Sequence, residues 1–197
     1  MITREKFKLI EENWGELASW AVWAEKGSTP KSNIEDLTIF KREKILGELN
    51  PEVIFVGLNI SRDDLKDREP FANFHSGYGH AQEYKLRYVL KDTPLWGGYL
   101  TDIIKDHPEI NSANVLKKLK ENPQIEVENI KRFQREILDL GSINPILIAL
   151  GGATYKILLR NFKQFRVVKI THFSARVALE KYKSEVEKTY KSLNMSF

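Results

Sequence analysis

Apolar residues in the first 25 positions recur at intervals of three and four, which is typical of an amphipathic helix. We predict such a helix over about residues 3–25, with the tryptophans of this segment as packing residues. The residues of its apolar face are Phe7, Ile10, Trp14, Leu17 and Ala21. A turn at residues 27–30 would end this helix, and Asn33 would cap a second one that runs to about Leu49.

Short, uninterrupted apolar runs follow, and these are typical of buried strands. We predict strands at about residues 53–58, 98–103, 145–150 and 166–171, and they alternate with helical stretches. Such alternation favours parallel pairing with helices on both faces. The sequence therefore predicts an α/β fold, a three-layer α/β/α arrangement around a short, mainly parallel four-stranded sheet. With no internal repeat or linker, residues 1–197 are expected to form one domain.

Composition narrows the class of protein. The absence of cysteine excludes disulfides and thiolate metal sites, and the longest apolar run is too short to cross a bilayer. We expect a cytoplasmic monomer with no membrane partner. The net charge is only +4, but residues 141–197 hold 10 Lys/Arg against 3 Glu. This excess predicts a phosphate-binding face or, equally well, a solvated lysine-rich helix surface.

Polar sequences follow several of the predicted strands. Ligands of open α/β sheets bind beyond the carboxyl ends of the strands, where Asn59, Asp102 and the segment 172–174 would lie. Gly151 and Gly152 open a predicted helix, whose free backbone N–H groups could bind a phosphate. We expect these strand ends to converge on one site.

Familiar motifs for cofactors and triads are missing from the chain. The glycine pair at 151–152 lacks the lysine and hydroxyl residue of a P-loop, and Gly57 lacks the later glycines of a dinucleotide-binding turn. No serine stands in a Gly-x-Ser-x-Gly elbow, and the four histidines show no metal-ligand spacing. We therefore expect neither a cofactor nor a metal.

Five segments, in chain order, resemble motifs of the uracil-DNA glycosylase superfamily. They are Val53–Asn59, Pro70–Phe71, Tyr99–Lys105, Ile146–Thr154 and His172–Ser174. The resemblance covers about residues 51–178, whereas the N-terminal helices of residues 1–50 match no part of that family. It implies the fold of these enzymes and their reaction in base excision repair of DNA. That reaction is hydrolysis of the N-glycosidic bond of a flipped, deaminated or damaged base such as uracil.

The resemblance also implies roles for residues around the base. Asn59 would orient the attacking water, and His172 would stabilise negative charge on the departing base. Gly57 belongs to the motif beside the base. Phe71 would stack on the base, with Phe74 as the alternative. These residue types suit the chemistry, because an aromatic platform binds a flipped base and a preorganised donor stabilises the leaving group.

Other residues would contact the DNA, single-stranded or a mismatched duplex. By the same resemblance, Ser174 and the glycines Gly151 and Gly152 would bind backbone phosphate. The residues just beyond the last motif, Ala175 and Arg176, would act as a wedge in the duplex. The basic final third of the chain fits such a partner.

The chain departs from the family pattern at three positions. Ile60 and Phe173 replace prolines that stiffen the first and last motifs. Asp102 stands where the family has an asparagine that reads the base edge, and an ionised carboxylate would repel O4 of uracil. This departure leaves open which base is recognised, and a non-catalytic module that binds nucleic acid or a nucleotide is the alternative function.

Structural explanations of the same residues also stay open. Asn59 and Asp102 could satisfy local turns, and Phe71 and Phe74 could be core residues. The glycine pair at 151–152 could serve only tight packing of strand against helix.

Overall fold

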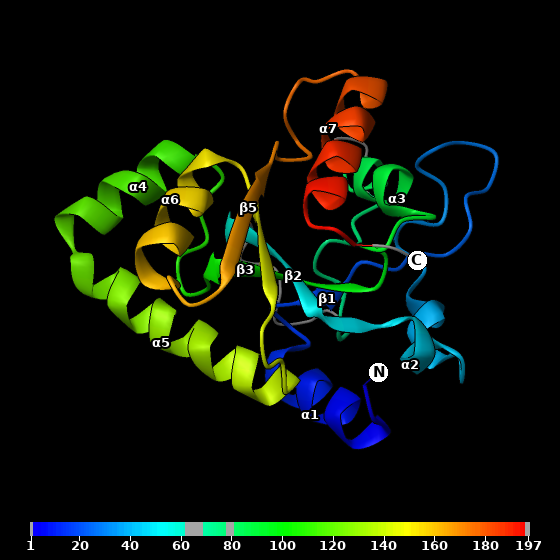
Figure 1. The fold of residues 1–197 in the computed structure, drawn as a ribbon, viewed down its shortest axis with the longest axis horizontal. Helices are drawn as coiled ribbons and strands as arrows, with labels where there is room; N and C mark the ends of the chain where they lie inside the picture. The colour runs from blue at the N-terminus through cyan, green and yellow to red at the C-terminus, as the bar shows by residue number, and fades with distance from the viewer. Residues whose placement is uncertain (1, 62–68, 78–80, 196–197) are drawn as a thin grey trace.

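A computed structural model describes residues 2–61, 69–77 and 81–195. Its centre is a five-stranded mixed sheet in the order β1-β3-β2-β4-β5 (Figure 1). The strands are β1 Ser19–Trp20, β2 Asn50–Asn59, β3 Gly98–Ile104, β4 Ile146–Leu150 and β5 Arg166–Ile170. All neighbours pair in parallel except β1, which is antiparallel to β3. The predicted parallel strands are confirmed, but the predicted count of four is wrong, because the short β1 adds a fifth at one edge.

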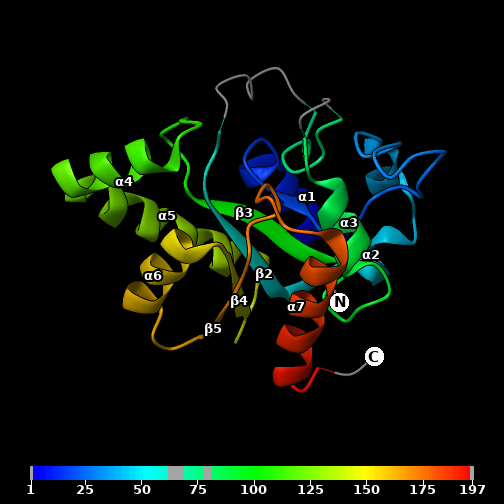
Figure 2. The same ribbon diagram turned by 90° about the horizontal axis from the view of Figure 1, so that it is seen from above.

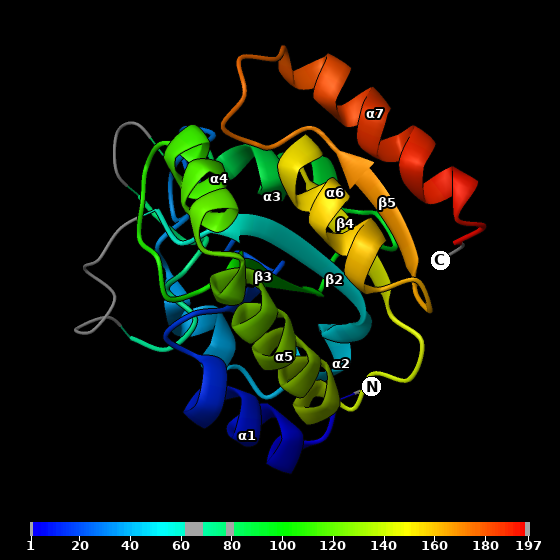
Figure 3. The same ribbon diagram turned by 90° about the vertical axis from the view of Figure 1, so that its left-hand side faces the viewer.

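Helices cover both faces of this sheet (Figures 2 and 3). One face carries α1 Arg4–Trp14, α4 Ser112–Glu121, α5 Pro123–Leu140 and α6 Gly152–Asn161, and the other carries α3 Tyr84–Leu90 and α7 Leu179–Ser192. The alternation of side chains along β2 explains the two cores. Ile54 and Val56 pack in the first core, and Val53 and Phe55 pack in the second. None of the helices among the described residues is long and apolar enough to span a bilayer.

The order of the strands determines where a ligand can bind. The chain passes from the central strand β2 to β3 on one side, and later to β4 on the other side. This reversal separates the loops that leave the carboxyl ends of β2 and β4. In open α/β sheets the resulting crevice is the usual position of a ligand site.

The predicted helix over residues 3–25 is wrong beyond Trp14. Residues 18–24 are all buried, which an amphipathic helix with one solvent face does not allow. Instead the chain turns after α1 and enters the sheet as β1, and the N–H of Ala21 donates to the carbonyl of Gly98 at 2.7 Å. The helical spacing of apolar residues continues past Trp14 only because residues 18–24 are all buried, and a fully buried run is compatible with any spacing.

The predicted second helix over residues 33–49 is also wrong. The segment forms a short 3-10 helix, Leu37–Lys41, and a single turn of helix, α2 Ile45–Glu48. Its buried apolar residues are Ile34, Ile39, Phe40, Ile45 and Leu49. The steps of five positions from Ile34 to Ile39 and from Phe40 to Ile45 do not fit one face of a helix.

The other helices carry residues typical of helix ends. Gly141 caps α5 in a left-handed conformation with φ of 70°. Pro123 occupies the first turn of α5. Asn111 caps α4, and its side chain accepts from the N–H of Ala113. The last helix, α7, was not predicted.

Candidate functional site

A cleft of about 630 Å³ lies at the carboxyl ends of β2 and β4. Its walls are the end of β2, the first turn of α6 and the loops that follow β3 and β5, together with part of the segment 73–76 and residues 81–83 before α3. Six residues predicted for the site line it, namely Asn59, Phe74, Gly151, Gly152, His172 and Ser174. Gly57, Phe71, Asp102 and Arg176 are not among its lining residues.

Asn59 ends β2 with its amide fixed in one orientation. Its Nδ2 donates to the carbonyls of Ile60, His107 and Glu109 at 2.8, 3.3 and 2.7 Å. The reverse orientation would place Oδ1 against three carbonyl oxygens, so the assignment is unambiguous. None of the described residues donates to Oδ1. The hydrogen-bonding capacity that Asn59 offers to a ligand is therefore an acceptor.

His172 follows β5 as a neutral donor. The backbone N–H of Ser174 donates to Nδ1 at 3.2 Å, and the Ser174 hydroxyl lies 2.8 Å from the same nitrogen. Because Nδ1 accepts, the proton of the neutral ring is on Nε2. Burial lowers the pKa of His172 to about 4, so the ring carries no charge at pH 7. The imidazole stacks on Phe173 with ring centroids 4.3 Å apart.

Phe74, which is 7% exposed, lines the cleft together with Phe173. It has a φ of 64° and lies edge-on to Phe173, with ring centroids 6.3 Å apart. Phe71, the first choice for base stacking, is fully buried in the core against Phe7 and Phe40, so its predicted place in the cleft is wrong. Two phenylalanines three positions apart look alike in the sequence, and only the turns between them decide which one reaches the cleft.

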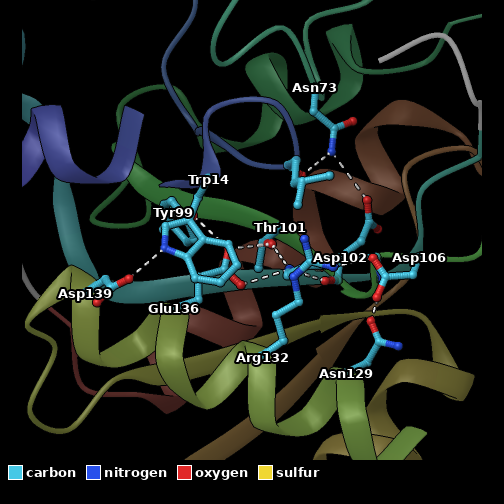
Figure 4. Close-up of polar contacts among 12 residues, drawn as sticks. Trp14, Asn73, Tyr99, Thr101, Asp102, Asp106, Asn129, Arg132, Glu136 and Asp139 are labelled. Carbon is cyan, nitrogen blue, oxygen red and sulfur yellow. Dashed lines mark hydrogen bonds and ion pairs between the residues drawn. The ribbon is translucent and has the colours of Figure 1, made fainter. Parts of the chain in front are cut away.

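Asp102 is buried below the cleft, contrary to the expected base-reading position. Its Oδ2 accepts from Nδ2 of Asn73 at 3.4 Å, and Asn73 itself lines the cleft (Figure 4). The carboxylate lies against the backbone of Gly57, where a Cβ would collide with Oδ1. Burial raises the pKa of Asp102 to about 6, although Lys105 and Asn73 lower it. Gly57 thus makes room for Asp102 and does not face the cleft.

Asn73 is a cleft residue that the sequence did not reveal. Its Nδ2 also donates to the carbonyl of Leu17 at 2.7 Å, and its Oδ1 accepts from the N–H of Phe74 at 3.2 Å. The side chain therefore links Asp102 to the backbone that carries Phe74. A lone asparagine in a polar loop gives no signal of such a link.

The amino terminus of α6 faces the cleft without a capping side chain. Gly151 has a φ of 99°, which favours glycine, but a Cβ on Gly152 would meet nothing within 4 Å. Tight packing therefore does not explain Gly152. The hydroxyl of Thr154, buried in the first turn, has no hydrogen-bond partner among the described residues. The first turn of α6 thus combines free backbone donors with an unsatisfied hydroxyl.

The loop after His172 is held by a contact from α3, which lies on the opposite face of the sheet from α6. Nζ of Lys85, on α3, donates to the carbonyl of Ala175 at 3.0 Å. Arg176 is exposed and lies outside the cleft lining, where it remains available to a large ligand. The sequence could not show where Ala175 and Arg176 lie relative to the cleft, because the contact that holds this loop comes from Lys85, 90 residues away from Ala175.

No group of three or more His, Asp or Glu side chains that could bind a metal ion occurs in the part of the chain that the structure describes. Comparison of the chain with protein-family models, with curated proteins and with solved structures finds no match.

Proposed function

We propose that the chain is a DNA glycosylase-like hydrolase that cleaves the N-glycosidic bond of a flipped, deaminated or damaged base. The observation that carries this proposal is the pairing of Asn59 and His172 in one cleft. One residue offers a fixed acceptor, and the other offers a neutral N–H donor. Hydrolysis of this bond needs both, an acceptor for the attacking water and a donor for the departing base.

The reaction follows from these two groups. A water that donates to Oδ1 of Asn59 attacks C1′ of the sugar, and the bond between C1′ and the base nitrogen breaks. The bonding electrons leave with the base, whose negative charge Nε2–H of His172 stabilises. The sugar keeps the hydroxyl of the water, and the proton passes through solvent to the base. Asn59 positions the water without taking its proton, since an amide is not a base at neutral pH.

Two further features of the cleft support a nucleotide as the ligand. Phe74 gives an aromatic surface for the base, and base stacking on such a ring contributes roughly 1–3 kcal/mol. The first turn of α6 provides N–H donors for a phosphate. Gly151, Gly152 and Ser174, the residues expected to bind phosphate, all line the cleft.

The fold supports the same proposal. A mainly parallel sheet with helices on both faces, and a cleft at the reversal of strand order, agrees with a three-layer uracil-DNA glycosylase-like domain. The five resembling segments include the two that end at Asn59 and begin at His172.

A module that binds nucleic acid or a nucleotide without cleaving it is the second candidate. Asn59 favours this candidate, because an amide, unlike a carboxylate, cannot act as a general base for the attacking water. Asp102 favours neither function, since its carboxylate is buried below Asn73.

The deciding experiment measures abasic sites as alkali-sensitive strand breaks. The substrates are single-stranded and mismatched duplex oligonucleotides that carry uracil, hypoxanthine or xanthine. We expect cleavage of at least one base by the wild type and its loss in His172→Ala. Binding without cleavage of any base would favour the second candidate, and absence of binding would contradict both.

A further inference from the structure

Ile110 is an apolar residue held in solvent at the edge of the cleft. Its side chain is 83% exposed, and it lines the cleft from the loop between β3 and α4. Single exposed apolar residues are common on proteins. The surroundings of Ile110 distinguish it from such residues.

The loop that carries Ile110 is fixed on both sides of it. On one side, Nδ2 of Asn59 donates to the carbonyls of His107 and Glu109, and the N–H of Glu109 donates to the carbonyl of Ile60 at 3.2 Å. These contacts attach the loop to the end of β2, and to the residue that we propose positions the water.

On the other side, Asn111 caps α4 and donates its N–H to Oε1 of Glu109 at 2.8 Å. Asn114 donates to Oε2 of the same carboxylate at 3.1 Å. Glu109 is therefore used to brace the turn around Ile110. A turn braced in this way presents an apolar side chain that little of its own protein covers.

We propose that Ile110 is a wedge that inserts between the bases next to the flipped nucleotide. This inference rests on the proposed function and names a contact of the same site. Proteins that unstack nucleic acid insert apolar side chains such as isoleucine between base steps. A wedge must keep its position against the stack, and the braced turn provides that rigidity.

The position of Ile110 also agrees with the arrangement of phosphate-binding and apolar groups around the cleft. The free donors of α6 form one wall, and Ile110 extends from the loop after β3, where Glu109 is a poor neighbour for phosphate. The partner that fits is a stacked nucleic acid, with its phosphates at α6 and its bases toward Ile110. This assignment replaces Ala175 as the expected wedge, because Ala175 is only partly exposed and its carbonyl is bound by Lys85.

Ile143 provides a matched control. It is the same residue type, is 89% exposed, and lies in the loop before β4, at the other ends of the strands from the cleft. Ile110→Ala and Ile143→Ala remove the same atoms from equally exposed positions. Their thermal unfolding should be equal to that of the wild type.

The test uses a duplex with one uracil opposite guanine and 2-aminopurine as the next base, together with a single strand of the same sequence. Binding of the wild type should raise the 2-aminopurine fluorescence of the duplex. Ile110→Ala should abolish this rise and weaken duplex binding by about tenfold, because a buried apolar contact is lost. Its affinity for the single strand should stay within about twofold of the wild-type value, and Ile143→Ala should match the wild type throughout.

Three results would overturn the inference in distinguishable ways. Ile110→Ala that matches Ile143→Ala on the duplex would show that Ile110 is not a wedge, while the proposed function stands. Equal losses on duplex and single strand would show a general contact instead of unstacking. A wild type that binds neither oligonucleotide, whether the lesion is uracil, hypoxanthine or xanthine, would contradict the proposed function itself, and the wedge with it.

Discussion

Two polar regions of the molecule, the buried cluster between β3 and α5 and the cleft at the strand ends, use their hydrogen bonds in opposite ways. In the cluster, Nζ of Lys105 donates to Thr101 and to the carbonyl of Asp102 at 2.7 and 2.6 Å, and it forms an ion pair with Oε2 of Glu136 at 2.8 Å. Tyr99 and Thr101 donate to the second oxygen of Glu136 at 2.7 and 2.8 Å. Each donor of this cluster has an acceptor inside the protein.

The cleft lacks this completeness. Oδ1 of Asn59, Nε2 of His172 and the hydroxyl of Thr154 have no partner among the described residues. Each of these side chains is nevertheless held in place, since the opposite atom of Asn59 and of His172 is bound and Thr154 is fully buried. In these two regions, a network whose donors are all bound stabilises the fold, whereas fixed groups with remaining hydrogen-bonding capacity line the cleft and are suited to bind a ligand.

The largest effect is expected in the completed cluster. Glu136→Gln should lower the free energy of unfolding by about 3 kcal/mol, because it leaves the buried charge of Lys105 without the carboxylate that it contacts directly. The control is Glu121→Gln, which removes an exposed ion pair with Lys117 and should cost less than about 1 kcal/mol. Urea unfolding measures both. Equal values for the two variants would show that the buried pair does not specify the fold.

The next effect is on activity in the cleft. His172→Ala should reduce base excision by about 10²–10³-fold, the usual consequence of removing one preorganised donor. The free energy of unfolding should change by less than about 1 kcal/mol, because the ring is half-buried and its contacts are local. His172→Gln keeps an N–H donor and should retain part of the rate. Single-turnover excision and urea unfolding test this, and full activity of His172→Ala would remove His172 from the reaction.

A smaller effect concerns the amide of Asn59. Asn59→Asp looks favourable for catalysis, but it would place carboxylate oxygens against the carbonyls of His107 and Glu109. We expect a loss of about 2 kcal/mol in unfolding free energy and faster hydrogen exchange in residues 107–111. Stability equal to the wild type, together with faster excision, would contradict the role of Asn59 as the anchor of this loop.

The smallest effect is a pH dependence at Asp102. Because burial raises its pKa to about 6, the native carboxyl binds a proton more tightly than the unfolded chain does. Its contribution to stability should therefore fall as pH rises from about 4 to 6, by about 2 kcal/mol. Asp102→Asn should remove this fall. The difference in unfolding free energy between variant and wild type should thus grow across that window, and a constant difference would contradict the burial of the charge.

The sequence predicted the parts of the fold that depend on local pattern. The strands around Phe55 and Ile148 were predictable because uninterrupted apolar runs bounded by polar residues are typical of buried strands. The strand at Ser19–Trp20 was not, because its pairing with Tyr99 joins residues 79 positions apart. In that segment the same apolar positions agree both with the spacing of a helix and with a fully buried stretch of chain.

The site was predictable to the same extent. Asn59 and His172 could be placed together because the carboxyl ends of parallel strands meet at one edge of a sheet. Phe71 and Asp102 were misplaced because burial depends on distant contacts, from Phe7 in one case and Asn73 in the other. Ile110 was missed because nothing in the sequence distinguishes an exposed isoleucine from a buried one.

The central claim is that the cleft contains a neutral imidazole donor for a base, and ¹⁵N NMR of His172 tests it most directly. The resonances, assigned with His172→Gln, are followed from pH 5 to 8, without and with a single strand that carries 2′-fluoro-deoxyuridine. We expect a proton on Nε2 throughout, no titration above pH 5, and a shift of Nε2 when the oligonucleotide binds. An imidazolium at pH 6, a proton on Nδ1, or an unchanged Nε2 at saturation would contradict the account.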